Sequence, residues 1–152
     1  ILQALAVIQR NMELIMPVHP RTVDKLNSGE NKQIISKMKN LHLIDPLGYL
    51  DFMKLMSNAS VILTDSGGIQ EESTILRIPC LTLRENTERP VTIAMGTNKL
   101  AGTTTCGIIS AYKNIVKDSD KHFDVPPLWD GQANIRIAQI LLDEFQNGFL
   151  IQ

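Results

Sequence analysis

The sequence predicts an α/β fold in which helices pack on a parallel sheet. Short apolar runs alternate with segments of helical periodicity along all 152 residues, which is the pattern of repeated strand and helix units. Hydrophobic residues make up 43% of the chain, enough to bury one core, and this length favours one domain over two. We therefore expect a single domain that spans residues 1–152.

The first half of the chain contains two expected strands. Residues 14–18 form a buried apolar run, and residues 41–44 form the next one. The segments around them are expected to be a helix at 1–12, a loop at 19–22, a short helix at 23–27 and a polar surface connection at 28–33.

The second half predicts three more strands, at residues 60–65, 79–84 and 98–102. The expected helices are 49–58, 67–77, 88–95, 107–116 and a closing amphipathic helix at 132–145, with an irregular segment at 118–131. About five strands and six or seven helices match the size of one Rossmann-like unit, in which a parallel sheet lies between two helical layers.

The composition argues against several classes of partner. Fifteen basic residues nearly balance sixteen acidic ones, so no strong field attracts nucleic acid or an anionic membrane. Cys80 and Cys106 are far apart and form no CxxC pair, so we expect neither a metal site nor a disulfide framework, in a reduced, cytoplasmic chain. No membrane helix or signal peptide is expected.

The start of the chain suggests a fragment. Residue 1 is Ile, and the opening residues read as the middle of an amphipathic helix with no Ser, Thr, Asp or Asn cap before it. We therefore expect an upstream domain that this sequence lacks.

The strongest local signal is the run VILTDSGGIQEES at residues 61–73. A Ser-Gly-Gly turn between a buried strand and a helix exposes backbone N–H groups at the positive end of the helix dipole, which favours an anion such as phosphate. Ser66 adds a hydroxyl, and Gly67 and Gly68 allow close approach. Glu72 lies one helical turn after Gly68, where a ribose diol would suit it.

A purely structural interpretation of this run also exists. Glycines are common in tight turns that pack a helix closely on a strand, and Glu72 could be a solvated helix residue. The spacing alone does not separate the two interpretations.

The segment RENTERP, residues 84–90, is the second signal. A helix that begins near Arg89 places a cation where the helix dipole disfavours it by a few tenths to about 1 kcal/mol. An anion bound between Arg89 and the Gly67–Gly68 turn would remove this conflict. Alternatively, Glu85 or Glu88 neutralises Arg89 in a weak surface pair.

Histidines and the tryptophan are weaker candidates. His19 follows a strand directly, so we expect it on the same rim as Ser66 and Arg89, although a lone His is more often structural. His42 and His122 read as structural or solvated residues. Trp129 would pin the long irregular segment to the body or line one edge of a ligand site.

Together these segments resemble the non-hydrolysing UDP-N-acetylglucosamine 2-epimerases, enzymes with the two-domain GT-B fold. The resemblance runs in family order through VHP, LIDPLGYLDFMKLM, ILTDSGGIQEES, PCLTLRENTERP, GTNKLAGT and WDGQA. It implies that the chain is the C-terminal, nucleotide-binding half. The implied partners are a UDP-sugar substrate, the missing N-terminal domain and a second copy in a homodimer, with no cofactor and a role in cell-surface polysaccharide biosynthesis.

The resemblance also implies residue roles. Ser66, Gly67 and Gly68 would bind the diphosphate, Glu72 the ribose hydroxyls and Arg89 the phosphates. The implied place of Phe52 is beside the uracil, and that of His19 is beside the diphosphate, where it would influence catalysis. Two departures bear on these roles: Leu47 replaces an often polar residue near the uracil, and PRT follows His19 where many members have an Asn-containing variant.

The family reaction removes the sugar C2 proton, expels UDP to leave a glycal, and adds UDP back after reprotonation from the other face. Its acid and base would come from the N-terminal domain, so the isolated chain is expected to be inactive. Three alternatives stay open on sequence alone: a UDP-sugar glycosyltransferase of the same fold, a hydrolysing epimerase, and a sugar-nucleotide-binding module without catalysis.

Overall fold

The computed structural model describes residues 1–117 and 123–146. All five expected strands are present at their expected places. Four of them are shorter than the range that the sequence predicts. Their bounds are β1 Leu14–Pro17, β2 Leu41–Ile44, β3 Ile62–Thr64, β4 Cys80–Thr82 and β5 Asn98–Leu100. The helices are α1 Leu2–Ile8, α2 Pro20–Leu26, α3 Gly29–Ile35, α4 Tyr49–Ser57, α5 Gly67–Leu76, α6 Pro90–Ala94, α7 Thr105–Lys117 and α8 Ala133–Gln146.

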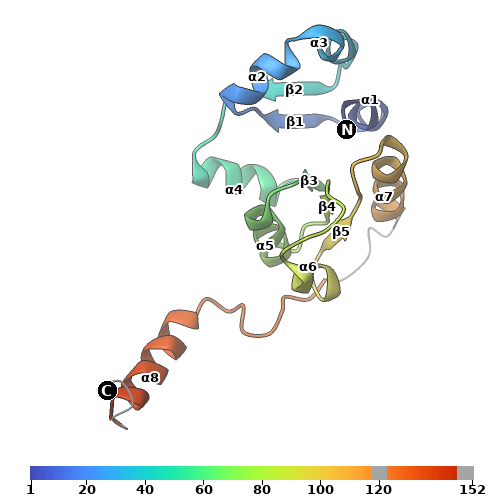
Figure 1. Cartoon of the computed structure of the whole chain (residues 1–152). Coiled ribbons are helices and arrows are strands. Elements are labelled where there is room, and N and C mark those ends of the chain that lie inside the picture. The colour runs from blue at the N-terminus through green and yellow to red at the C-terminus, as the bar shows by residue number, and fades with distance from the viewer. Residues whose placement is uncertain (118–122, 147–152) are drawn as a thin grey trace.

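Every strand pair is parallel, as expected, but the strands form two sheets (Figure 1). β1 pairs with β2, and β4 lies between β3 and β5. No backbone ladder joins β1 to β3. Side chains join the two sheets instead, because Leu14 of β1 and Leu63 of β3 pack against the same core cluster.

Helices cover both faces of the β3-β4-β5 sheet, which gives the expected three layers (Figure 1). Successive strand residues point to opposite faces. In β4, Leu81 joins the cluster under α1 and α7, whereas Cys80 joins the cluster under α4 and α5. Ile62 and Leu63 of β3 divide in the same way.

Two local expectations in the first half are wrong. The segment expected to be a polar surface connection forms helix α3, whose Ile34 and Ile35 are half-buried and which packs against α1 and α2. The preceding helix starts at Pro20 rather than at Val23. Pro20 suits the first helical position, and the ring of His19 caps the helix by accepting the backbone N–H of Arg21.

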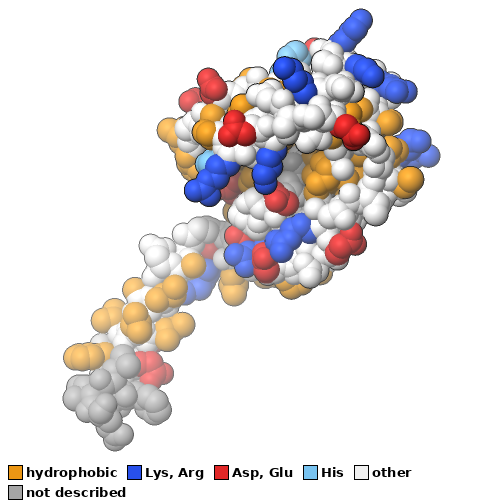
Figure 2. Space-filling model, turned by 45° about the horizontal axis from the view of Figure 1, so that its top comes forward, with side chains coloured by type: hydrophobic (Ala, Val, Ile, Leu, Met, Phe, Trp, Pro, Cys, Tyr) orange, Lys and Arg blue, Asp and Glu red, His pale blue; other side chains and the backbone are white. Residues whose placement is uncertain are grey.

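Helix α8 forms as expected but extends away from the rest of the chain (Figures 1 and 2). It buries none of its residues, and its exposed apolar side chains are Ile135, Ile137, Ile140, Leu141, Leu142 and Phe145. Within residues 1–117 and 123–146, no helix is both long and apolar enough to cross a membrane. His122 and the first part of the irregular segment lie outside the described residues.

Candidate functional site

The turn between β3 and α5 presents an open helix start. Ser66 is the N-cap residue of α5, yet its hydroxyl makes no capping hydrogen bond. Its backbone N–H donates to Thr64 Oγ1 at 3.0 Å. Ser66 and Gly68 are exposed and Gly67 is partly exposed. Because the first amides of a helix lack partners within it, this turn offers N–H donors to an anion.

The segment that contains Arg89 lies against this turn. A methyl group at Gly67 would be 3.3 Å from Glu88 Oε2 and 3.9 Å from Arg89 Nε. A side chain at position 67 would therefore crowd the end of Glu88 and reach ordinary contact distance of Arg89. The structure thus brings the Gly67 turn and Arg89 together, which is the arrangement that an anion site requires.

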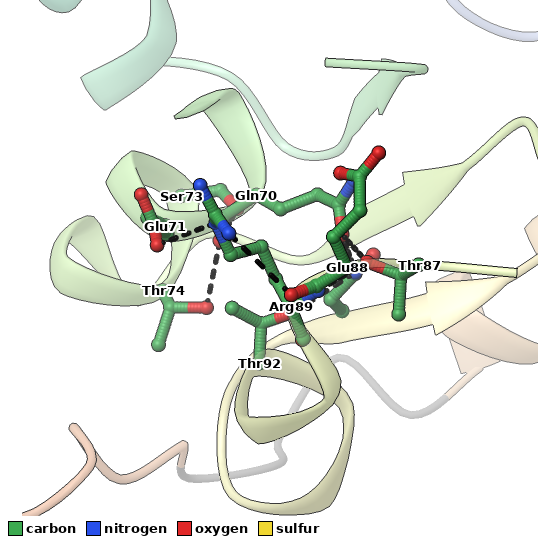
Figure 3. Close-up of polar contacts among 9 residues, drawn as sticks. Gln70, Glu71, Ser73, Thr74, Thr87, Glu88, Arg89 and Thr92 are labelled. Atoms are coloured by element: carbon green, nitrogen blue, oxygen red, sulfur yellow. Dashed lines mark hydrogen bonds and ion pairs between the residues drawn. The ribbon is translucent and has the colours of Figure 1, made fainter. Parts of the chain in front are cut away.

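Arg89 is paired with Glu71 rather than with Glu85 or Glu88, the two partners that the sequence suggests. Its Nε atom is 2.7 Å from Glu71 Oε1 (Figure 3). Nε has no hydrogen bond of acceptable geometry, so this contact is an ion pair with poor alignment. Glu88 instead pairs with Arg84 at 3.1 Å, and Glu85 accepts from the backbone and hydroxyl of Thr103 at 3.1 Å.

The remaining candidates are placed separately. Glu72 is half-buried on α5, one turn after Gly68. Phe52 is half-buried on α4 and packs against the core cluster that contains Met56 and Cys80. His19 caps α2 at the end of the other sheet, where its ring contacts the backbone of its own helix.

Comparison with known proteins assigns the family. The sequence model described as UDP-N-acetylglucosamine 2-epimerase matches residues 1–142. The chain belongs to this epimerase family. It is 45% identical over 134 residues to the UDP-N-acetylglucosamine 2-epimerase of Methanococcus maripaludis, and this match covers 86% of the chain and 35% of the relative. For the enzyme of Salmonella typhimurium the identity is 39%, with 93% and 39% covered.

Solved structures of epimerases agree with this assignment. The UDP-GlcNAc 2-epimerase of Methanocaldococcus jannaschii superposes with a TM-score of 0.81 at 36% identity, covering 93% of this chain and 39% of that one. A complex of the same enzyme with UDP-GlcNAc and UDP has a TM-score of 0.75 at 34% identity, covering 93% and 41%. The chain therefore spans about two fifths of its relatives' length, and its fold is one half of the epimerases' GT-B architecture.

Sequence reasoning missed a buried polar layer under the candidate epimerase site. Gln70, Thr82, Thr92 and Asn98 are all at most 2% exposed, and hydrogen bonds connect them to the Arg89 segment. A signal existed in the sequence, since Gln70 shares the inner face of α5 with Ser73 and Thr74, both fully buried. Polar residues on a buried helix face require partners.

The polar groups at the α5 turn are suited to binding an anion and hydroxyl groups. The turn, Ser66 and Arg89 can hold a doubly charged phosphate group, and Glu72 can accept from hydroxyls. Two hollows of about 390 and 410 Å³ lie between α1 and α3 and beside β2, and none of the candidate residues lines them. The polar groups at the α5 turn lie on an exposed part of the surface instead.

Proposed function

We propose that this chain is the UDP-binding part of a UDP-N-acetylglucosamine 2-epimerase that interconverts UDP-GlcNAc and UDP-ManNAc. The proposal rests on the close approach of the Gly67 turn and Arg89. It rests also on the match of residues 1–142 to this family. The solved complex of a relative with UDP-GlcNAc and UDP supports the ligand class.

In the proposed complex the diphosphate lies at the start of α5. Backbone N–H groups of Gly67 and Gly68, the Ser66 hydroxyl and the Arg89 guanidinium bind its oxygens. Arg89 can turn from Glu71 to the ligand at little cost, because both side chains of this pair are about 40% exposed and such pairs contribute roughly 0 to 1 kcal/mol.

The nucleoside would extend along α5 and α4. Glu72 is placed to accept hydrogen bonds from the ribose hydroxyls, and Phe52 would pack beside the uracil. We assign His19 to the diphosphate side of the cleft, with an influence on catalysis, as the family resemblance implies. Because the His19 ring accepts from the backbone of its own helix, this role depends on the ligand bridging His19 and the α5 turn.

The proposed reaction proceeds through elimination and re-addition. A base removes the proton from C2 of the sugar, the C1–O bond breaks, and the electron pair of the C2–H bond forms the C1–C2 double bond of a glycal while UDP leaves. The N–H groups, Ser66 and Arg89 stabilise negative charge on the departing β-phosphate. Reprotonation of C2 from the opposite face and re-addition of UDP complete the inversion, with the acid and base supplied from outside this chain.

Titration calorimetry of the chain with UDP tests the proposal. We expect weak binding, because only one wall of an interdomain cleft is present, and at least about a tenfold loss in Arg89→Ala, since a charge-assisted contact is removed. Arg77→Ala is the matched control, because Arg77 caps the opposite end of α5. Equal affinities in the two variants would remove the phosphate role of Arg89.

Product analysis with the longer protein distinguishes the reaction type. UDP-ManNAc as the product supports the non-hydrolysing epimerase, whereas free N-acetylmannosamine would indicate the hydrolysing enzyme. Release of UDP and glycal without any acceptor would exclude a glycosyltransferase.

A further inference from the structure

A ring of hydrogen bonds begins and ends on the backbone of Arg89. The Arg89 N–H donates to Thr87 Oγ1 at 2.9 Å, and the Thr87 hydroxyl donates to Gln70 Oε1 at 2.6 Å. Asn98 Nδ2 donates to the same Gln70 oxygen at 2.9 Å and to Thr92 Oγ1 at 3.1 Å. The Thr92 hydroxyl donates to the Arg89 carbonyl at 2.7 Å, which closes the ring.

Each proton in this ring has its own acceptor. A hydroxyl has a single proton, and that of Thr92 is used on the Arg89 carbonyl, so Thr92 must accept from the amide nitrogen of Asn98. Asn98 Oδ1 then faces the Thr82 hydroxyl, from which it accepts at 2.7 Å. The remaining Asn98 proton is donated to the oxygen of Gln70.

Gln70 connects this ring to the candidate anion site. It belongs to α5, the same rigid helix whose start carries Gly67 and Gly68, and its side chain reaches across to the Arg89 segment (Figure 3). One side-chain oxygen of α5 therefore accepts two of the hydrogen bonds that hold the Arg89 segment beside the α5 amides. A side chain of another length at position 70 would move the two halves of the site relative to each other.

The two ends of the Gln70 amide differ in their partners. Gln70 Nε2 is buried and has no hydrogen-bond partner among the described residues. Its oxygen, with two donors aimed at it, is the part of the amide that the structure uses.

We propose that Gln70 is a positioning residue for UDP binding, which holds Arg89 over the start of α5 through Thr87 and Asn98. This inference rests on the proposed function, because it assigns the geometry of the same site. Gln70 does not touch the ligand; it acts through the backbone of Arg89.

Two substitutions break the ring at different points. Thr87→Val keeps the shape but removes both the acceptor for Arg89 and the donor to Gln70, and Thr87→Ser keeps the hydroxyl. Gln70→Met keeps the length of the side chain without the amide oxygen. Thr74→Val is the matched control, because the buried Thr74 hydroxyl donates only to the α5 backbone, at the Gln70 carbonyl.

The first measurement is UDP affinity by titration calorimetry, well below the unfolding temperature of each variant. We expect Thr87→Val and Gln70→Met to lose about tenfold, which corresponds to about 1.4 kcal/mol, and Thr87→Ser and Thr74→Val to stay within about twofold. Wild-type affinity in folded Thr87→Val would overturn the proposal, even where Gln70→Met fails to fold.

The second measurement is the NMR signal of the Arg89 Nε–H group in the chain without ligand. We expect it to shift in Thr87→Val and Gln70→Met and to keep its wild-type position in Thr87→Ser and Thr74→Val. This signal separates the two proposals. If the wild-type chain does not bind UDP, the proposed function fails, while an unchanged Arg89 signal in Thr87→Val shows by itself that the ring does not position Arg89.

Discussion

Arg89 on the segment after β4 and Glu71 on α5 form an ion pair, with Nε 2.7 Å from Oε1. The carboxylate holds the guanidinium beside the helix start where the diphosphate is proposed to bind. In the proposed complex, Glu71 would therefore compete with the ligand for the same cation.

Glu71→Gln should bind UDP about three- to tenfold more tightly than the wild type. The substitution removes a competing carboxylate and a negative charge near the phosphates. Titration calorimetry at low and high salt measures the effect, which should shrink as salt rises. Glu13→Gln, a change in an exposed residue before β1, is the charge-matched control. Weaker binding in Glu71→Gln would mean that Glu71 orients Arg89 for the ligand.

Glu72→Gln should weaken UDP binding more than binding of 2′-deoxy-UDP. The carboxylate is proposed to accept from both ribose hydroxyls, and the deoxy ligand has already lost one of those contacts. Calorimetry of both proteins with both ligands gives the difference between the two losses in binding free energy. Equal losses for both ligands would argue against a ribose contact.

Two glycines should respond in opposite ways to alanine. In Gly67→Ala the new methyl meets the flexible end of Glu88 at 3.3 Å, so the fold should survive while UDP affinity falls about tenfold, because the phosphate loses its close approach. In Gly96→Ala the methyl meets Thr74 at 2.6 Å and the Thr92 carbonyl at 2.7 Å, and overpacking of this kind costs roughly 1 to 3 kcal/mol.

Thermal melts and UDP titrations of both glycine variants provide the measurement. Unchanged UDP affinity in a folded Gly67→Ala variant would contradict a phosphate seat at this turn. An unaffected melting temperature in Gly96→Ala would contradict the close packing there.

The buried thiol of Cys80 should lower stability at high pH. Burial raises its pKa from 9.0 to about 11, so above pH 9 the unfolded chain loses this proton while the folded chain keeps it. The free energy of unfolding should therefore fall between pH 9 and 11, by up to roughly 2 to 3 kcal/mol. Urea titrations across this range should show a shallower decline in Cys80→Ala, and identical slopes would contradict the prediction.

Helix α8 should be the least protected long helix of the isolated chain. Its residues are unburied, whereas α7 buries Ile108, Tyr112 and Ile115, and a helix of this length is marginal in water without packing. Hydrogen exchange should be much faster in α8 than in α7. Comparable protection in the monomeric chain would mean that α8 packs against the body in solution.

The family motif and the strand positions were accessible from the sequence because they depend on local patterns. The apolar runs at β1 to β5 are short and bounded by turn residues, and the Ser-Gly-Gly turn defines the start of α5. The segment of α3 was missed because its polar opening resembles a loop, whereas packing against α1 and α2 stabilises a helix there.

What the sequence alone determined is the alternation of strands and helices and the family to which the chain belongs. Tertiary structure decided that Glu71 rather than Glu85 or Glu88 pairs with Arg89, and that Gln70 closes a ring through Asn98. Local sequence rules concern residues that are neighbours along the chain. The two ring partners of Gln70, by contrast, lie 17 and 28 positions away from it. They meet it only when β4 and β5 pack beside α5.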